Sequence, residues 1–285
     1  MRKFFIYFFA MILFTGVCYA SEIENDFETE VFFHRVKEVE LPIVMYHLVT
    51  ENSRYIGKYG ITPADFEKDL KYLKDNEYNT VVMQDLIDFV NRGKKLPKNP
   101  IMITIDDGNS SDFYYVLPLL KKYKMKAVIA ILGEPSDECT VYAERNPDGR
   151  YPHLSWSQIE ALHKSGHVEI QNHSYSLHTP PTGSGKRGNE SIEAYHARLY
   201  KDLQKLQEAC AAHLNYVPTT FVYPLGVIGV NSKAVLENLG MSGSISCQEG
   251  MNTIRQGDKD CLFKLRRSNR PSSRSIEDIL QKLKG

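Results

Sequence analysis

A run of apolar residues at 101–105 leads directly into two carboxylates and a glycine, Asp106, Asp107 and Gly108. The run, Ile-Met-Ile-Thr-Ile, shows no alternation of apolar and polar positions. Such a run is typical of a strand that is buried on both faces of a parallel sheet. Because catalytic side chains in α/β folds lie just past the carboxyl ends of such strands, we expect Asp106 and Asp107 at the mouth of a site. A simple turn after a core strand is the alternative interpretation.

Apolar and amphipathic segments alternate along most of the remaining chain, which favours parallel βαβ units. Two capping boxes, at Thr62 to Asp65 and at Ser155 to Gln158, predict helix starts. We expect one domain over residues 41–285, because no break for a second domain is visible. The pattern predicts strands at 41–47, 80–83, 101–105, 127–132, 168–171, 220–223 and 263–267, helices after Thr62 and at 85–92, 110–124, 155–165, 191–212, 232–239 and 276–283, and a long polar loop at 139–151.

Two histidines, His173 and His178, follow the apolar stretch at 168–171. Residues five positions apart do not share a face of a helix or of a strand, so these rings converge only if the segment is irregular. Two imidazoles and one carboxylate form a site that suits zinc with an open position for water. Two unrelated histidines on a solvated loop are the alternative interpretation.

Three short motifs carry a family resemblance. Thr104-Ile-Asp-Asp-Gly108, His173-Ser-x-x-x-His178 and Phe221-Val-Tyr-Pro-Leu-Gly226 resemble, in their order and separation, the successive motifs of the polysaccharide deacetylase family, carbohydrate esterase family four. The resemblance extends from about Leu41 to the C-terminus. It implies an α/β fold, a distorted (β/α) barrel, and metal-dependent removal of acetyl groups from N-acetylated sugars.

The resemblance also implies roles for the residues of the first two motifs. Asp106 would be the catalytic base, and Asp107, His173 and His178 would hold a divalent metal. Zinc is the expected ion, with cobalt or nickel as alternatives. An N-cap on the following helix is the alternative role for Asp107.

The third motif implies an oxyanion site. The family commonly has Pro-Tyr at its end, and the backbone N–H after the proline stabilises the tetrahedral oxyanion. Here the residue after Pro224 is Leu225, and a backbone donor survives this change of side chain. Tyr223 and Pro224 would support the same rim of the barrel.

Two departures from the family pattern concern an arginine and a histidine. Some members carry an arginine two residues before the proline, where this chain has Val222, and Arg266 or Arg267 could substitute for it. Surface charge is the alternative for both. Many members also place a catalytic histidine near the C-terminus, but no histidine follows position 213. His47, at the end of the first predicted strand, is our candidate for the general acid, as in the branch that acts on poly-N-acetylglucosamine. A ring bonded to a core carbonyl is the alternative.

The balance of charge limits the partners. Lys plus Arg and Asp plus Glu each number 35, so the formal net charge of zero gives no electrostatic support to a nucleic-acid partner. We expect a monomer that acts on an N-acetylated glycan polymer containing GlcNAc, such as poly-N-acetylglucosamine, peptidoglycan or a chitin-like chain. An O-acetyl xylan esterase on the same scaffold and a glycan-binding relic without turnover are the alternatives.

The N-terminus has the pattern of an export signal. Arg2 and Lys3 precede an apolar run at 4–17, and a small-x-Ala site follows at 18–20. We predict a signal peptide over 1–20, an acidic spacer over 21–40 with an added strand around 31–33, and an extracytoplasmic protein, secreted or associated with the cell surface. An uncleaved N-terminal anchor is the alternative and would be the only membrane contact.

Four cysteines remain after the predicted cleavage, at positions 139, 210, 247 and 261. They form no CxxC motif, so a structural zinc knot has no support. Export permits disulfides. Cys247 and Cys261 flank one loop and are the predicted pair, with free buried thiols as the alternative.

Overall fold

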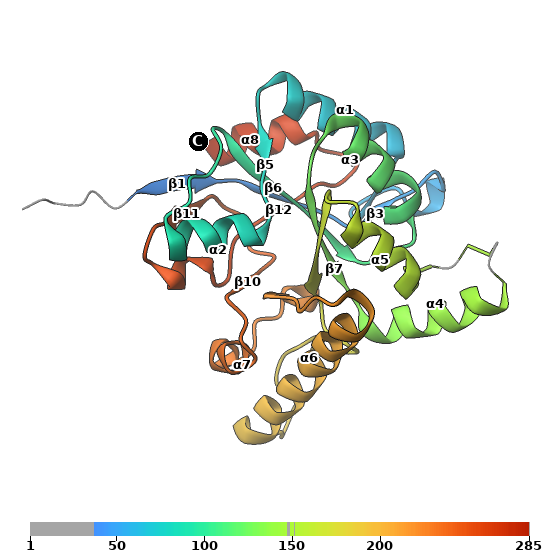
Figure 1. Cartoon of the computed structure of the whole chain (residues 1–285), viewed down its shortest axis with the longest axis vertical. Helices are drawn as coiled ribbons and strands as arrows, with labels where there is room; N and C mark the ends of the chain where they lie inside the picture. The colour runs from blue at the N-terminus through green and yellow to red at the C-terminus, as the bar shows by residue number, and fades with distance from the viewer. Residues whose placement is uncertain (1–36, 147–148, 151, 285) are drawn as a thin grey trace, which may run out of the picture. The chain divides into compact units, whose positions relative to one another are not determined.

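Short strands alternate with helices along the chain (Figure 1). The structure, a computed structural model, describes residues 37–146, 149–150 and 152–284. The strands are β1 (Glu38–Leu41), β2 (Ile43–Tyr46), β3 (Leu48–Val49), β4 (Gly60–Ile61), β5 (Asn79–Thr80), β6 (Pro100–Asp107), β7 (Ala127–Ile131), β8 (Val168–Asn172), β9 (Thr220–Val222), β10 (Gly243–Ile245), β11 (Asn252–Arg255) and β12 (Ser268–Asn269). The helices are α1 (Pro63–Asp75), α2 (Met83–Arg92), α3 (Leu117–Tyr123), α4 (Gly133–Arg145), α5 (Trp156–Lys164), α6 (Ile192–Leu214), α7 (Ser232–Asn238) and α8 (Ile276–Lys284). A π-helical turn, η2 (Asp112–Val116), precedes α3, and 3₁₀ turns lie at η1 (Ser53–Tyr55), η3 (Pro224–Gly226) and η4 (Lys259–Leu262).

The central sheet is parallel, with the spatial order β10-β9-β8-β7-β6-β2-β12. Strand β6 lies near its middle, paired with β2 on one side and with β7 on the other. The predicted strand at 101–105 is confirmed, and its residues are buried. This burial on both faces explains why the run lacks an alternation of apolar and polar positions.

One segment joins the two edges of this sheet. Leu265 forms a parallel bridge with Ile245 of β10, and Ser268 pairs with Val44 of β2. The sheet therefore curls round on itself, and the expected (β/α) barrel is confirmed. The strand predicted at 263–267 is wrong, and the strand of this segment is β12, at Ser268–Asn269. Lys264 has a left-handed backbone with φ +59°, which interrupts the extended conformation.

Helices cover the outside of the sheet, and α1 and α5 start at the two predicted capping boxes. Thr62 accepts a hydrogen bond from the backbone N–H of Asp65 at 3.0 Å, and the Asp65 carboxylate reaches back in a capping box. Helix α1 packs beside α3 and α8 (Figure 1). Its apolar stripe of Phe66, Leu70 and Leu73 is fully buried.

Some predicted boundaries are wrong. The segment at 139–151 is not a loop throughout, because α4 runs to Arg145. The buried face of α4 is made of small residues such as Ser136 and Cys139, so the sequence of this helix shows no apolar stripe. The predicted strand at 80–83 ends at Thr80, and Met83 already begins α2. The predicted helix at 110–124 is divided into η2 and α3, and Pro118 lies in the first turn of α3.

The N-terminal predictions fall largely outside the described residues. The signal peptide at 1–20 and the added strand at 31–33 both lie there. The end of the predicted spacer is ordered, because β1 includes Glu38–Leu41 and pairs antiparallel with β11. Over residues 37–146, 149–150 and 152–284, no helix is long and apolar enough to cross a membrane.

The predicted disulfide between Cys247 and Cys261 is wrong, since all four described cysteines are free. The Cys247 sulfur lies 3.9 Å from the Met45 sulfur, beside the sheet. The Cys261 sulfur instead accepts a hydrogen bond from the backbone of Arg255 at 3.4 Å. The two thiols therefore have separate surroundings, and a disulfide needs both sulfurs in direct contact.

Candidate active site

The two carboxylates after β6 point in different directions. Asp106 is 2% exposed, whereas the side chain of Asp107 is 22% exposed. The backbone turns left-handed at this point, with φ +77° at Asp107 and +62° at Gly108. A non-glycine residue in this conformation costs on the order of 1–3 kcal/mol, so the surrounding structure must hold Asp107 there.

Asp107 faces both predicted histidines. Its Oδ1 lies 3.5 Å from His173 Nε2 and 3.3 Å from His178 Nε2. One candidate ligand atom from each of the three residues lies within 4.8 Å of the others. His173 directly follows β8, and the left-handed backbone of Ser174, with φ +87°, starts the loop that returns His178 to the site.

Hydrogen bonds orient this histidine loop. The Asn172 side-chain oxygen accepts from Ser174 N at 2.8 Å, and Ser174 Oγ accepts from Leu177 N at 3.0 Å. His173 Nδ1 lies 2.8 Å from the Val222 carbonyl oxygen, to which a ring N–H at Nδ1 donates. In the neutral ring, Nε2 of His173 then carries a lone pair that faces the Asp107 carboxylate.

This arrangement fits a divalent cation. Asp107 Oδ1 is buried and has no hydrogen-bond partner among the described residues. Buried polar atoms are seldom left without a partner, and here two imidazole nitrogens face the same oxygen. Two histidines and one carboxylate are a donor set that zinc prefers, with a further position open to water.

Asp106 forms a buried ion pair with Arg267. The Arg267 guanidinium donates to both carboxylate oxygens, at 2.7 Å each, and is 0% exposed. It also donates to the Ser246 carbonyl at 2.7 Å and to Thr104 Oγ1 at 3.2 Å. Burial by itself would raise the pKa of Asp106, but the charges of Arg267 and His173 outweigh it and hold that pKa well below its usual range. Asp106 is therefore ionised at neutral pH.

The two arginines considered from the sequence have different environments. Surface charge is the wrong interpretation for Arg267, which is fully buried, and it is right for Arg266. Arg266 is exposed and lines a separate cavity with Asp258 and Asp260. Arg266 and Arg267 point in different directions because the segment from Leu265 to Ser268 passes between β10 and β2, with one of its faces toward the barrel interior.

His47 lies on the same rim, directly after β2. Its Nε2 is 3.9 Å from Asp106 Oδ2, and its side chain is 16% exposed. Burial lowers the pKa of His47, against the opposing effect of Asp106 and Asp107. The ring packs against Tyr59 at 4.7 Å between centroids. Its Nδ1 has no hydrogen-bond partner among the described residues, so the alternative of a ring bonded to a carbonyl is wrong.

A cavity of about 360 Å³ brings these groups together. Leu225 lines it with φ +57°, whereas the Tyr223 hydroxyl is buried elsewhere, 2.8 Å from Ser232 Oγ. Neither Tyr223 nor Pro224 is among the residues that line the cavity. The complete lining is Met45, His47, Lys58, Tyr59, Asp106, Asp107, His173, His178, Leu225, Cys247, Glu249 and Asn269.

Sequence reasoning did not find several of these lining residues. Lys58 and Tyr59 lie in an irregular loop between β3 and β4, where no periodic pattern marks them. Cys247 and Glu249 follow β10, so the rule that sites lie at strand ends was a usable signal. The short strand at 243–245 was not predicted, so Cys247 and Glu249 could not be recognised as residues that follow a strand end.

Comparison with known proteins decides the family. The family model described as polysaccharide deacetylase matches residues 93–244, more than half of the chain. The protein belongs to the polysaccharide deacetylase family. A Staphylococcus aureus relative (strain NCTC 8325 / PS 47) named poly-beta-1,6-N-acetyl-D-glucosamine N-deacetylase is 24% identical over 227 residues, covering 79% of this chain and 74% of the relative. The Bacillus subtilis putative polysaccharide deacetylase YxkH is 25% identical over 231 residues, covering 81% and 72%.

Solved structures share the fold of this deacetylase. A de-N-acetylase from Aggregatibacter actinomycetemcomitans superposes with a TM-score of 0.72 at 24% identity, covering 85% of this chain and 99% of that chain. IcaB from Ammonifex degensii gives 0.68 at 23% identity, covering 86% and 97%. Within this fold, Val222 stands where some family members carry an arginine, and Arg267 of the closing segment bonds the carboxylate of Asp106 instead.

Proposed function

We propose that this deacetylase hydrolyses the N-acetyl groups of a GlcNAc-containing polysaccharide, with poly-N-acetylglucosamine as the first substrate to test. The observation that carries the proposal is the convergence of Asp107, His173 and His178 in one cavity with Asp106 and His47. The names of its relatives support the choice of an amide over an ester. The reaction makes the protein a hydrolase of carbon–nitrogen bonds other than peptide bonds.

Asp107, His173 and His178 would hold the divalent metal, zinc with cobalt or nickel as alternatives. When bound, such an ion lowers the pKa of a water ligand to about 7 and polarises the acetyl carbonyl. The residues of the chain must then position the sugar and move two protons. The first proton leaves the attacking water, and the second reaches the departing amine.

Asp106 accepts the first proton in this mechanism. Its carboxylate stays ionised because Arg267 donates to both of its oxygens. Asp106 must also remain close to the water, and the bidentate bond fixes its orientation. A carboxylate with a low pKa is a weak base, so much of the driving force for this proton transfer must come from the acidity of the attacking water.

His47 donates the second proton to the leaving nitrogen. An amine anion is a very poor leaving group, so the amide bond breaks only with this proton in place. The position of His47 on the cavity wall, next to Tyr59, leaves the ring able to approach a bound sugar. The backbone N–H of Leu225 would donate to the developing oxyanion.

An exposed aromatic ring at the cavity wall supports a sugar as the substrate. Tyr59 is 49% exposed at its wall and offers a ring face for stacking. Loss of acetyl groups leaves amines, so the product becomes cationic while the substrate is neutral. We place the protein outside the cytoplasm, secreted or at the cell surface, as a monomer whose only membrane contact would be an uncleaved N-terminal segment.

Five single variants test the assignment of roles. Alanine at Asp107, His173 or His178 should lower metal content and acetate release together. Asp106→Asn should keep the metal and lose turnover, because an amide cannot accept the proton of water. Metal analysis and acetate release from poly-N-acetylglucosamine measure both quantities. Loss of the metal in Asp106→Asn, with retention in Asp107→Asn, would reverse the two roles.

Acetylated xylan serves as the comparison substrate. Faster release from xylan than from the GlcNAc polymer would favour the O-acetyl esterase. A protein that contains the metal but releases no acetate from either glycan would favour the glycan-binding relic. The second outcome would also contradict the role of His47, since a relic needs no proton donor.

A further inference from the structure

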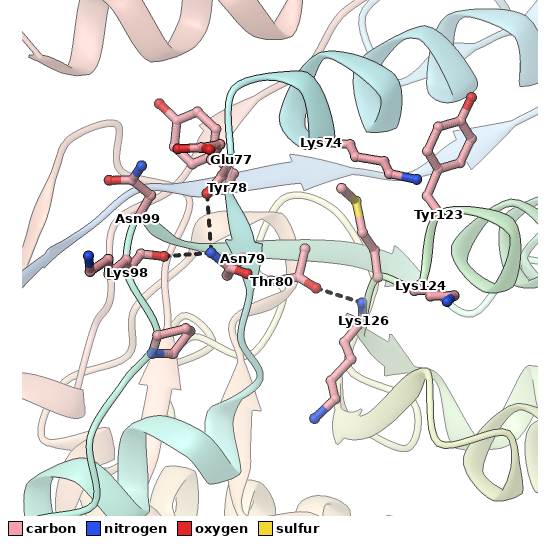
Figure 2. A pocket seen from close by; sticks show the side chains of 12 residues that line it. Lys74, Glu77, Tyr78, Asn79, Thr80, Lys98, Asn99, Tyr123, Lys124 and Lys126 are labelled. Atoms are coloured by element: carbon pink, nitrogen blue, oxygen red, sulfur yellow. Dashed lines mark hydrogen bonds between the residues drawn. The ribbon is translucent and has the colours of Figure 1, made fainter.

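A second, larger cavity lies at the opposite end of the sheet. It has a volume of about 840 Å³ and is lined by the start of the sheet and by the ends of α1 and α3 (Figure 2). Strand β6 begins at Pro100, next to the lining residue Asn99, and ends at Asp107. Seven steps of about 3.3 Å place the two cavities roughly 23 Å apart. We call this second space the basal cavity; its lining is Lys74, Glu77, Tyr78, Asn79, Thr80, Pro97, Lys98, Asn99, Tyr123, Lys124, Met125 and Lys126.

Positive charge dominates the basal cavity. Its lining holds Lys74, Lys98, Lys124 and Lys126 but a single carboxylate, Glu77, although the formal charges of the whole chain sum to zero. None of these four lysines forms an ion pair within 4.0 Å among the described residues. Four unneutralised ammonium groups around one hollow raise the local concentration of anions.

Hydrogen bonds between three loops hold the lysines around this hollow. The Asn79 side chain donates to the Lys98 carbonyl at 2.8 Å and to the Glu77 carbonyl at 3.1 Å (Figure 2). Thr80 Oγ1 accepts from the backbone N–H of Lys126 at 2.7 Å. Segments far apart in sequence are thus tied together, and the Lys74 ammonium lies 5.8 Å from the centroid of the Tyr123 ring in the same lining.

The backbone at the basal cavity is unusual as well. Glu77, Asn99 and Lys124 all have left-handed φ angles, of +57°, +44° and +57°. Glycine would adopt this conformation with less strain, in particular at Lys124, which ends α3. Strained non-glycine residues cluster at functional sites, and here an ammonium group lies where glycine would fit best.

We propose that the basal cavity binds a polyanion, a segment of a chain that carries phosphate groups along its length. Lysines act as point charges that phosphate accepts without a fixed geometry, and the side-chain amide of Asn99 adds a neutral donor. A concave hollow suits a chain segment better than a flat bilayer. No large exposed apolar side chain occurs among the described lining residues, as insertion into lipid would require.

Such binding would hold the protein by the end opposite its candidate active site. The mouth of the site would then face away from the bound polyanion and toward a neutral glycan. This inference concerns the location of the enzyme and does not depend on which acetylated sugar it hydrolyses.

A quadruple variant tests the basal cavity: Lys74→Gln, Lys98→Gln, Lys124→Gln and Lys126→Gln together. The matched control changes the four exposed lysines 37, 68, 201 and 259, none of which lines the cavity, so both proteins lose the same net charge. Binding to inorganic polyphosphate is measured at low salt and again at about 0.3 M salt, where exposed charges are largely screened. Thermal unfolding of both variants confirms that they are folded.

The basal variant should bind polyphosphate about tenfold or more weakly than the parent, because four charge contacts each contribute a few-fold at low salt. The control should lose less than about threefold. Acetate release from a soluble oligosaccharide should be unchanged in both. An equal loss in the two variants, or no binding by the parent at low salt, would overturn the proposal.

Two further probes separate the source of the phosphate. Monomeric inorganic phosphate should compete weakly, since it cannot contact several lysines at once. Vesicles with about 30% anionic lipid should bind less than polyphosphate at an equal phosphate concentration. Stronger binding to the vesicles would show that the basal cavity faces a membrane, contrary to the polymer that we propose.

Discussion

Replacement of Arg267 by methionine should expose the energetics of the buried ion pair. Methionine keeps most of the aliphatic volume but removes both bonds to Asp106, each 2.7 Å long. Because Asp106 is 2% exposed, its carboxylate would be left buried and unpaired. Removal of one partner of such a pair typically costs about 3–5 kcal/mol in the free energy of unfolding. The same change raises the pKa of Asp106, because burial then acts on the carboxyl without the opposing charge and hydrogen bonds of Arg267.

The sign of the pH dependence follows from these shifts. In the parent, the pKa of Asp106 is lowered in the folded state, so its stabilising contribution is present above the unfolded pKa of about 3.9 and is lost as the pH falls through the folded value. In Arg267→Met the folded pKa rises above the unfolded value, and the contribution becomes a penalty at neutral pH. Protonation removes that penalty in acid. The difference in stability between the two proteins should therefore narrow from pH 7 to pH 4.

Urea unfolding at pH 7 and pH 4 measures this difference. Arg266→Met is the matched control, because Arg266 is the adjacent residue, is exposed and lines a different cavity. The control should remain within about 0.5 kcal/mol of the parent. Two results would show that the ion pair does not hold Asp106 in its charged form. Arg267→Met could be as stable as the control, or its loss of unfolding free energy relative to the parent could be as large at pH 4 as at pH 7.

Three further predictions concern single groups. His47→Ala should lower the rate of amide hydrolysis by about 10²–10⁴-fold without loss of metal, and should affect activated aryl acetate esters far less; an equal loss on both substrates would mean a structural role. Thr62→Ala removes the 3.0 Å cap bond of α1 and should cost about 1 kcal/mol in urea unfolding, whereas no change would show that the capping box is not stabilising. Thiol titration of the unfolded protein without reductant should find Cys247 and Cys261 both free, and a missing pair of thiols would contradict their separate surroundings.

Local physics made part of the fold predictable. A strand buried on both faces must be apolar at nearly every position, so the run at 101–105 could be identified without a structure. A capping box depends on two side chains three residues apart, and Thr62 and Ser155 could therefore be found by their spacing. Parallel strands end on one side of a sheet, and this rule placed Asp106, Asp107, His173 and His47 on the same rim.

The sequence by itself determined the type of chemistry, because strand ends and motif spacing are local properties. Only the tertiary structure decided which partner each group has. Arg267 and Arg266 are adjacent and chemically identical, and the path of the closing segment alone buries one and exposes the other. The free state of Cys247, the cavity wall at Tyr59 and the lysines of the basal cavity likewise depend on segments far apart in the chain. Contacts of this kind arise from packing, which leaves no period and no spacing in the sequence.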